Sequence, residues 1–232
     1  MPLPLSIARW LDIVLPRACL LCGAPATEAV CEGCRDDLPH LSAHTCPVCA
    51  APLTQPAPAC GECIKTPRSF DHTLAVWEYA YPVDRLVMQL KFGCRLASVD
   101  FFAAGMLAGA LPTGDLIVPV PLSPQRLRSR GFNQALEIAR PLSRALKIPL
   151  ARDLLFRCRE TVPQSQLPWR ARHRNVAHAF ECRADLAGKH IIVVDDVMTT
   201  GATLDAAART LKDHGAHRVT NWVAARAVKR II

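Results

Sequence analysis

The sequence predicts an α/β domain with a mostly parallel sheet flanked by helices, preceded by a small cysteine-rich zinc-binding module. Eight of the eleven cysteines form four C-x-x-C pairs within the first 63 residues. After residue 68, short apolar runs alternate with amphipathic stretches, a pattern typical of parallel sheets covered on both faces. We therefore expect two units, a zinc-binding module at residues 1–68 and an α/β domain at 69–232.

The composition indicates a packed globular protein. Half of the residues are hydrophobic and 21% are charged, which argues against disorder. No apolar run reaches the roughly 18 residues that a membrane helix needs. Arg9 and Asp12 interrupt the apolar N-terminus, which lacks the features of a signal peptide and predicts a short amphipathic helix over the next module. So many cysteines without an export signal favour a reducing, cytoplasmic location.

The net charge of +8 is unevenly distributed. Residues 1–72 hold five Lys/Arg and seven Asp/Glu, a formal −2, and the remainder holds 23 and 13, a formal +10. Most of the excess lies in 121–183, with 13 basic and four acidic residues. The positive field predicts anionic partners, either phosphorylated small molecules or nucleic acid.

The four cysteine pairs have the spacing of zinc knuckles. Two pairs supply the four thiolates of a tetrahedral Zn²⁺ site and leave no position open, so the metal would be structural. The predicted ligands are Cys19, Cys22, Cys31, Cys34, Cys46, Cys49, Cys60 and Cys63. The spacing allows one or two sites, in consecutive or cross-braced order, and redox-active or unligated cysteines are the alternative. Three single cysteines are expected to be packing residues (Cys94, Cys158, Cys182), and two nearby histidines to be surface residues (His40, His44).

The second unit begins with a strand and two helices. Residues 70–80 are rich in β-formers, residues 83–92 have an amphipathic helical period, and residues 99–111 are apolar enough for a buried helix. Residues 116–121 form a short apolar strand that prolines end, and residues 133–147 have helical period, with Pro141 a kink or boundary.

The C-terminal half continues the alternation. A strand is expected within 148–159, and 160–175 is a polar, proline-broken loop. Further strands are expected at 176–182, 190–196 and 218–228, and a helix that Gly215 closes at 202–216.

One stretch combines acids with a phosphate-binding turn. The strand "IIVVDD" ends in Asp195 and Asp196, and "VMTTGATL" follows. Threonine hydroxyls and backbone N–H groups at a helix start hold phosphate well. The P-loop lysine and spacing are missing, and no G-x-G-x-x-G follows a strand. The alternative is a solvated turn, but both acids stand at the carboxyl end of a strand, where open α/β sheets bind ligands.

This stretch resembles the phosphoribosyl pyrophosphate (PRPP) motif of type I phosphoribosyltransferases. The resemblance implies that fold for about 74–228, with Asp195 and Asp196 contacting the ribose hydroxyls, stabilising the ribose in catalysis and lying near Mg²⁺. The turn residues that would bind the 5′-phosphate are Thr199, Thr200, Gly201, Ala202 and Thr203. The 6-oxopurine salvage enzymes carry an aspartate in place of Thr199, so the threonine resembles orotate-type members.

Basic residues elsewhere fit the same ligand. The resemblance places a pyrophosphate loop after the first core strand, where "PVPLSPQRLRSRGFNQA" (119–135) stands. Its guanidinium groups suit phosphate oxygens; the alternative is a basic solvated loop. The expected phosphate ligands there are Arg126, Arg130 and Gly131, with Arg128 alongside, and Lys91 in "LKFG" is a further candidate. The resemblance makes 159–176 the flexible loop that closes over PRPP, with Arg170, Arg172 and Arg174 near the leaving pyrophosphate; Trp169 stacks on a base or pins the loop.

Together these motifs resemble the ComF family over nearly the whole chain. That family combines a zinc-binding N-terminus with a phosphoribosyltransferase domain and is linked to natural competence. The resemblance implies PRPP, single-stranded DNA and competence or recombination proteins as partners. One hypothesis is a nucleic-acid accessory protein with a PRPP pocket. The other is an active phosphoribosyltransferase of unknown acceptor in nucleotide or amine metabolism, without a DNA role. No base-reading pattern in 70–100 identifies an acceptor.

Overall fold

A computed structural model describes residues 17–93, 97–158 and 179–228. The predicted N-terminal helix, Cys94 and the loop bearing Trp169, Arg170, Arg172 and Arg174 lie outside these residues. No helix among the described residues is long and apolar enough to cross a membrane.

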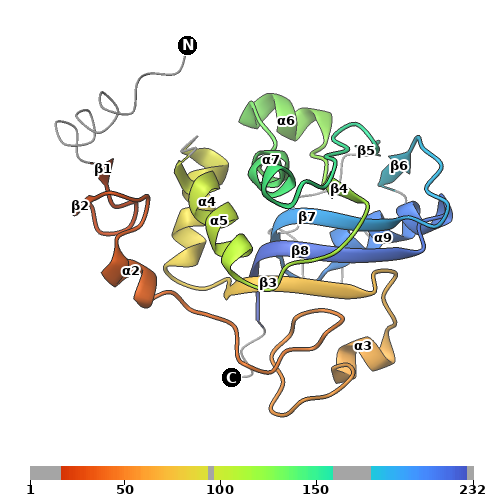
Figure 1. Ribbon diagram of the computed structural model, residues 1–232, viewed down its shortest axis with the longest axis horizontal. Helices are drawn as coiled ribbons and strands as arrows, with labels where there is room; N and C mark the ends of the chain where they lie inside the picture. The colour runs from red at the N-terminus through yellow and green to blue at the C-terminus, as the bar shows by residue number, and fades with distance from the viewer. Residues whose placement is uncertain (1–16, 94–96, 159–178, 229–232) are drawn as a thin grey trace.

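A four-stranded parallel sheet forms the centre of the fold, in the order β3-β8-β7-β4 (Figure 1). The strands are β3 (His72–Glu78), β4 (Leu116–Pro119), β7 (His190–Met198) and β8 (Arg218–Arg226). β7 and β8 are central and consist mainly of buried apolar residues, as parallel strands covered on both faces require. The prediction of a mostly parallel sheet is confirmed.

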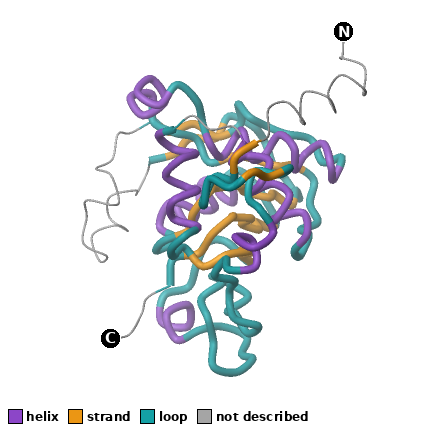
Figure 2. The backbone as a smooth tube through the Cα atoms, turned by 90° about the vertical axis from the view of Figure 1, so that its left-hand side faces the viewer, coloured by secondary structure: helices purple, strands orange, loops and turns teal. Residues whose placement is uncertain are grey.

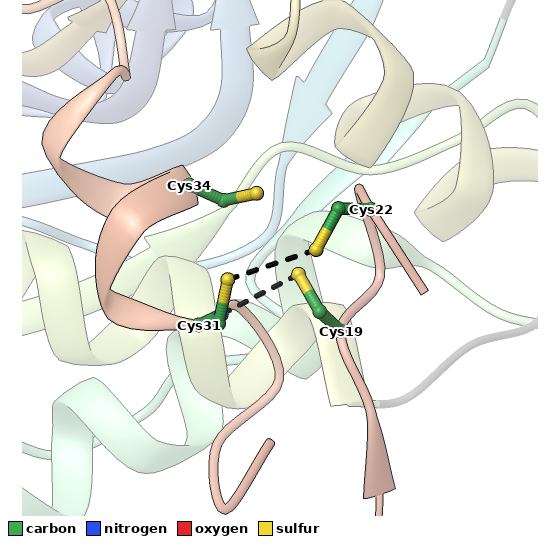
Figure 3. A group of neighbouring side chains, drawn as sticks. All are labelled: Cys19, Cys22, Cys31 and Cys34. Carbon is green, nitrogen blue, oxygen red and sulfur yellow. Dashed lines mark hydrogen bonds between the residues drawn. The ribbon is translucent and has the colours of Figure 1, made fainter. Parts of the chain in front are cut away.

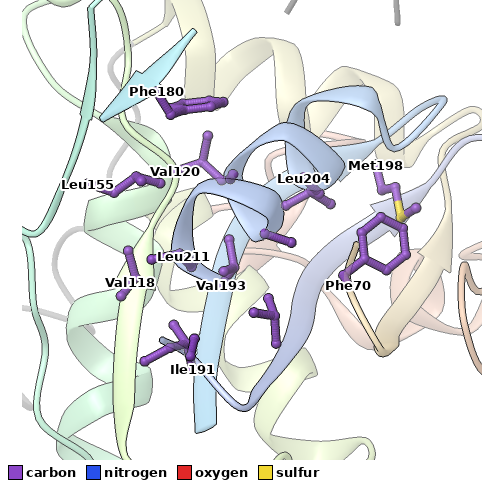
Figure 4. Packing of buried hydrophobic residues seen from close by; sticks show 14 of the residues in the cluster. Phe70, Val118, Val120, Leu155, Phe180, Ile191, Val193, Met198, Leu204 and Leu211 are labelled. Carbon is purple, nitrogen blue, oxygen red and sulfur yellow. The ribbon is translucent and has the colours of Figure 1, made fainter. Parts of the chain in front are cut away.

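Helices cover both faces of the sheet because the side chains of β7 alternate between two cores. Ile192 and Val194 pack with the helices α4 (Val83–Phe92), α5 (Ala97–Ala108) and α7 (Gln134–Leu146). Ile191 and Val193 pack with α9 (Ala202–Asp213) on the other face (Figure 4). Successive strand residues point to opposite faces, so Asp195 and Asp196 continue the two rows separately.

The basic segment 124–130 differs from the prediction of a loop, because it forms the helix α6 (Pro124–Arg130). The Ser123 side chain caps the helix by accepting a hydrogen bond from the Arg126 N–H at 3.4 Å, and Pro124 occupies the first turn. Gly131 ends it in the left-handed conformation, with φ of 82°. Beyond α7, β5 (Leu155–Arg157) pairs antiparallel with β6 (Phe180–Cys182).

Two details correct the sequence analysis. Pro141 does not bound its helix: α7 continues through it, and Ile138 and Leu142 hold its apolar face in the core. Cys158 is exposed and therefore is not a packing residue, whereas Cys182 is buried and its thiol donates to the Ala184 carbonyl at 3.6 Å.

The cysteine-rich segment forms two ribbons that pack on the α/β domain at different places (Figures 1 and 2). The first contains β1 (Arg17–Ala18), β2 (Pro25–Ala26) and α2 (Glu32–Asp36), and Val30 and Leu38 join the α4–α5 core. The second contains α3 (Gly61–Lys65) and shares the α9 core. Between the ribbons, His40 bridges antiparallel to Trp77 at the outer edge of β3. The boundary at residue 68 remains a prediction.

Candidate functional site

The eight knuckle cysteines form two consecutive groups of four, Cys19/22/31/34 and Cys46/49/60/63. Within each group all sulfur atoms lie within 4.8 Å of one another. The Cys22–Cys31 sulfurs are 3.7 Å apart and the Cys49–Cys60 sulfurs 3.6 Å apart. A tetrahedral Zn²⁺ with Zn–S bonds of about 2.3 Å has sulfurs about 3.8 Å apart, so both groups fit zinc. The geometry decides for consecutive sites over cross-bracing, and Figure 3 shows the first group converging on one point.

Backbone N–H groups support the sulfurs, as in zinc knuckles. The Cys31 N–H donates to the Cys19 sulfur at 3.4 Å, and the Cys60 N–H donates to the Cys46 sulfur at 3.3 Å. Burial alone would raise the pKa of Cys19, but backbone N–H groups outweigh it and lower the pKa to about 6. Hydrogen bonds to Cys22 and Cys31 raise the pKa of Cys34 to about 12. Four thiols this close deprotonate together only around a cation, which supports structural zinc.

The acidic pair lies near the carboxyl end of β7, and its two members have different surroundings. Asp196 is buried, with 3% of its surface exposed, and its Oδ2 lies 2.7 Å from the Lys91 Nζ on α4. Asp195 points to the opposite side of the strand, and its Oδ1 accepts the Asp196 N–H at 2.9 Å. The pair therefore offers one carboxylate held by a lysine and one without that counter-charge.

The pKa values of the pair diverge accordingly. Burial, and then the negative charge of Asp196, hold the pKa of Asp195 well above its usual range. Burial also acts to raise the pKa of Asp196, but the charge and hydrogen bond of Lys91 outweigh it and lower the pKa. Burial would lower the pKa of Lys91, but the same ion pair raises it. Perturbed, coupled groups of this kind are typical of functional sites.

These directions predict opposite effects on stability. The raised folded pKa of Asp195 means that its charge destabilises the fold at neutral pH, a cost that disappears as the pH falls through that raised pKa. The depressed pKa of Asp196 stabilises the fold above about pH 4, and this stability is lost as the pH falls through the depressed pKa. Asp195→Asn should therefore raise the free energy of unfolding at pH 7 by about 1 kcal/mol, because a half-buried charge beside another carboxylate is removed.

Asp196→Asn should lower the free energy of unfolding at pH 7 by about 2 kcal/mol, because Lys91 loses its counter-charge. The lysine side chain is 22% exposed, so the loss is smaller than for a fully buried pair. Urea unfolding of the two variants measures both changes, with the exposed Asp153→Asn as a control near zero. Shifts of the same sign for Asp195 and Asp196 would contradict this electrostatic assignment.

The turn after β7 is held in a defined conformation, and Gly201 is essential to it. Gly201 adopts the left-handed conformation with φ of 78°, and a Cβ there would lie 2.6 Å from the Met198 Cε. The Ala202 N–H donates to the Thr200 Oγ1 at 3.2 Å, and the Asp205 N–H donates to the Gly201 carbonyl at 2.8 Å, which starts α9. The turn therefore stands at a helix N-terminus, where backbone N–H groups and the helix dipole favour a phosphate.

Basic side chains from α4 and α6 face the acidic pair. The Arg130 Nη1 donates to the Gln134 Oε1 at 2.6 Å, and its guanidinium lies 5.4 Å from the ring centre of Phe92. Burial lowers the pKa of Arg130. The negative charges of Asp196 and Asp195 oppose this effect, and the positive charge of Arg126 adds to it, so these four groups act on one another.

Three further residues belong to this region and were missed by sequence reasoning. Arg157 on β5 is buried, and its charge interacts with Asp195 and Arg126. Burial raises the pKa of Tyr79, beside Lys91 and Asp196. Arg226 at the end of β8 donates to the Met198 carbonyl at 3.2 Å. None lies in a recognisable motif, and only a position at or near a predicted strand end marks them.

Comparisons with known proteins agree with this organisation. A family described as "Double zinc ribbon domain" matches residues 10–64, and one described as "Phosphoribosyl transferase domain" matches 133–229. "DNA utilization protein YhgH" of Escherichia coli K12 is 33% identical over 222 residues, covering 90% of this chain and 97% of that protein. "Competence protein F" of Haemophilus influenzae is 30% identical over 213 residues, covering 87% of this chain and 92% of that protein. The chain belongs to the ComF family. "Competence protein ComFC" of Bacillus subtilis is also 30% identical, over 200 residues, covering 81% of this chain and 80% of that protein.

Within the ComF family fold, most of the predicted site residues come together. The side chains that act electrostatically on one another are those of Lys91, Arg126, Arg130, Asp195 and Asp196. Residues 199–203 follow directly in the chain, and Gly131 is exposed at the end of α6. Arg170 and Arg174 lie outside the described residues.

A separate cavity of about 960 Å³ lies between the first ribbon and α5. Its wall includes Glu28, Asp36, Trp77, Asp100 and Phe101, and none of the acidic pair, the turn or the arginines of α6. The His40 side chain is exposed and also lines it, and His44 is exposed, as expected for surface residues. The acidic pair, the turn after β7 and the arginines of α6 therefore lie away from this cavity.

Proposed function

We propose that this ComF-family protein binds PRPP at the end of β7 and serves natural competence by handling incoming single-stranded DNA. One observation carries the PRPP assignment: an acidic pair, with Asp196 buried and Asp195 half-buried, adjoins a helix-starting T-T-G-A-T turn after one central strand. A sugar that carries both a diol and a phosphate needs carboxylates for its hydroxyls and a phosphate-binding turn. The matched phosphoribosyl transferase domain includes all of these residues.

The geometry supports a division of roles. The carboxylates of Asp195 and Asp196 accept hydrogen bonds from the ribose hydroxyls, and the 199–203 turn receives the 5′-phosphate. Lys91, Arg126 and Arg130, whose charges act on the acidic pair or on one another, would supply cations for the diphosphate on C1′. Since Lys91 already pairs with Asp196 at 2.7 Å, it neutralises part of the acidic charge that would otherwise repel this anion.

The same residues suit magnesium. Mg²⁺ prefers carboxylate oxygens together with substrate phosphates, and the less compensated Asp195 beside Asp196 supplies the carboxylates. Bound with PRPP, the ion would offset the diphosphate charge. The protein residues orient the sugar and exclude water from it.

The competence role rests on relatives that cover most of the chain. Their names include "Competence protein F", "Competence protein ComFC" and "DNA utilization protein". The basic balance of residues 121–183 supports contacts with a nucleic-acid backbone. Competence and recombination proteins are the partners that such a role implies, and a cytoplasmic location suits it.

Phosphoribosyl transfer is the second candidate function, favoured by the acidic pair and the cations around it. A nitrogen nucleophile would attack C1′ through an oxocarbenium-like state, the C1′–O bond would break, and pyrophosphate would leave towards the basic residues. Asp195 and Asp196 would stabilise the electron-poor ribose.

Two titrations test the proposal. Calorimetry with PRPP and Mg²⁺ should show saturable 1:1 binding, and affinity for a single-stranded oligonucleotide should decline steeply as salt rises. Pyrophosphate release from PRPP, measured against a panel of bases, amines and nucleic acids, separates transfer from binding alone. No heat with PRPP would refute the pocket, and salt-independent DNA affinity would refute the electrostatic DNA contact.

A further inference from the structure

One buried arginine contacts both the second cysteine group and the turn after β7. The Arg226 Nε donates to the carbonyl of Cys49 at 2.7 Å. Its Nη1 donates to the Met198 carbonyl at 3.2 Å and also to the carbonyls of Thr199 and Ala227. Cys49 belongs to the second cysteine group, and Met198 and Thr199 lead directly into the turn. A single planar guanidinium, buried with 7% of the residue exposed, therefore holds both.

An apolar layer provides a second link between the same two parts. Phe70 and Met198 lie in one core cluster with Cys46, Cys49 and Cys63. A Cβ on Gly201 would lie 2.6 Å from the Met198 Cε and 3.6 Å from the Phe70 Cζ, so the turn rests on these side chains. Figure 4 shows Phe70 beside Met198 near the start of α9.

The ribbon backbone is also bonded to the sheet that bears the turn. The Thr73 Oγ1 donates to the Val48 carbonyl at 2.7 Å, and the Thr73 N–H donates to the Pro47 carbonyl at 3.0 Å. Both acceptors stand between Cys46 and Cys49. The knuckle loop is thus fixed on the β3 side and its last residue is fixed by Arg226 on the turn side.

The first ribbon provides a contrast. It packs on α4 and α5, where the Gln89 Nε2 donates to the Leu20 carbonyl at 3.0 Å. Among the described residues, the hydrogen bonds of the first ribbon lead to α4 and to its own loops. Within the described ranges, the second ribbon alone shares a side chain with the turn.

We propose that Arg226 is a positioning residue that couples the second zinc ribbon to the phosphate turn, so that zinc at Cys46/49/60/63 and PRPP strengthen each other's binding. The inference rests on the proposed function, because PRPP is the ligand of the turn. The charges suit the coupling, since a four-thiolate zinc site carries two net negative charges and a guanidinium neutralises part of them. Coupling between two sites is reciprocal, so it can be measured from the zinc side.

The test follows zinc release to a chromophoric chelator. Cys31→Ser disables the first cysteine group, so that zinc release from this variant reports the second zinc alone. In the parent, the two zincs are followed as two phases of release, which gives the same comparison without a cysteine change. We expect PRPP with Mg²⁺ to slow release of the second zinc at least fivefold and to leave the first unchanged. Arg226→Met should abolish the slowing, and Arg209→Met, an exposed arginine on α9, should preserve it.

Amide exchange provides a readout that needs no ligand. Arg226→Met should speed exchange in residues 197–203 at least tenfold relative to Arg209→Met. If PRPP binds the parent but fails to slow release of the second zinc, or slows both zincs equally, the coupling is wrong and the PRPP site stands. If PRPP does not bind the parent, the proposed function fails. Independently of PRPP, unchanged amide exchange in Arg226→Met would overturn the coupling between the second ribbon and the turn.

Discussion

The double variant Asp195→Asn/Asp196→Asn is expected to lose PRPP affinity by at least about a hundredfold. Each hydrogen bond to a charged group contributes about 1.5–3 kcal/mol, and two such acceptors are removed from the ribose hydroxyls. The amides keep the size of the carboxylates and the Asp195 acceptor for the Asp196 N–H. Calorimetric titration with PRPP and Mg²⁺ at pH 7 measures the loss.

A matched control separates the site from the net charge. Asp153→Asn makes the same chemical change at an exposed acid that pairs with Arg152, and its affinity should equal that of the parent. Asp195→Asn alone guards against misfolding, because it is expected to be more stable than the parent and still to bind PRPP more weakly. Parental affinity in the double variant would show that the ribose does not lie on this pair.

Loss of the second zinc should lower the free energy of unfolding more than loss of the first zinc. A structural zinc contributes on the order of 10 kcal/mol to folding, and three ligands of the second group are buried within the α9 core. In the first group only Cys19 is buried. Cys60→Ser should therefore lower the free energy of unfolding by several kcal/mol more than Cys31→Ser, because its ribbon shares a core with β7 and α9.

These two cysteines make a matched pair. Each is half-buried and stands at the N-cap of a five-residue helix, α2 or α3. Zinc content should fall from two to one per chain in both variants, and urea unfolding followed by circular dichroism gives the stability. Equal losses in the two variants would mean that the second ribbon is no more integrated into the sheet than the first.

The sequence was sufficient to predict the parts whose physics is local. The strand run 191–194 is fully apolar because both faces of the sheet are buried, and knuckle spacing specifies a tetrahedral metal site by itself. The acidic pair and the 199–203 turn were recognisable for the same reason, since a strand end and a helix start adjoin in the chain. The parallel sheet and the eight zinc ligands followed from these signals.

The residues that were missed depend on contacts between distant segments. Arg226 is 27 residues beyond Thr199 and 177 beyond Cys49, and nothing near it in sequence marks a buried guanidinium. Arg157 and Tyr79 are similar, since only the packing of distant segments brings them near Asp195 and Lys91. The helix α6 was read as a loop because its arginines dominate the pattern, although Ser123, Pro124 and Gly131 supply its caps.

The most direct test of the central claim is a comparison of sugar phosphates. If the carboxylates hold the diol and the turn holds the phosphate, ribose 5-phosphate should bind the parent at least about tenfold more tightly than 2-deoxyribose 5-phosphate, since one hydrogen bond to a charged group is lost. Asp195→Asn/Asp196→Asn should bind the two equally, and unphosphorylated ribose should bind neither protein. Equal affinity of the parent for both sugar phosphates would contradict the assignment of the acidic pair to the ribose.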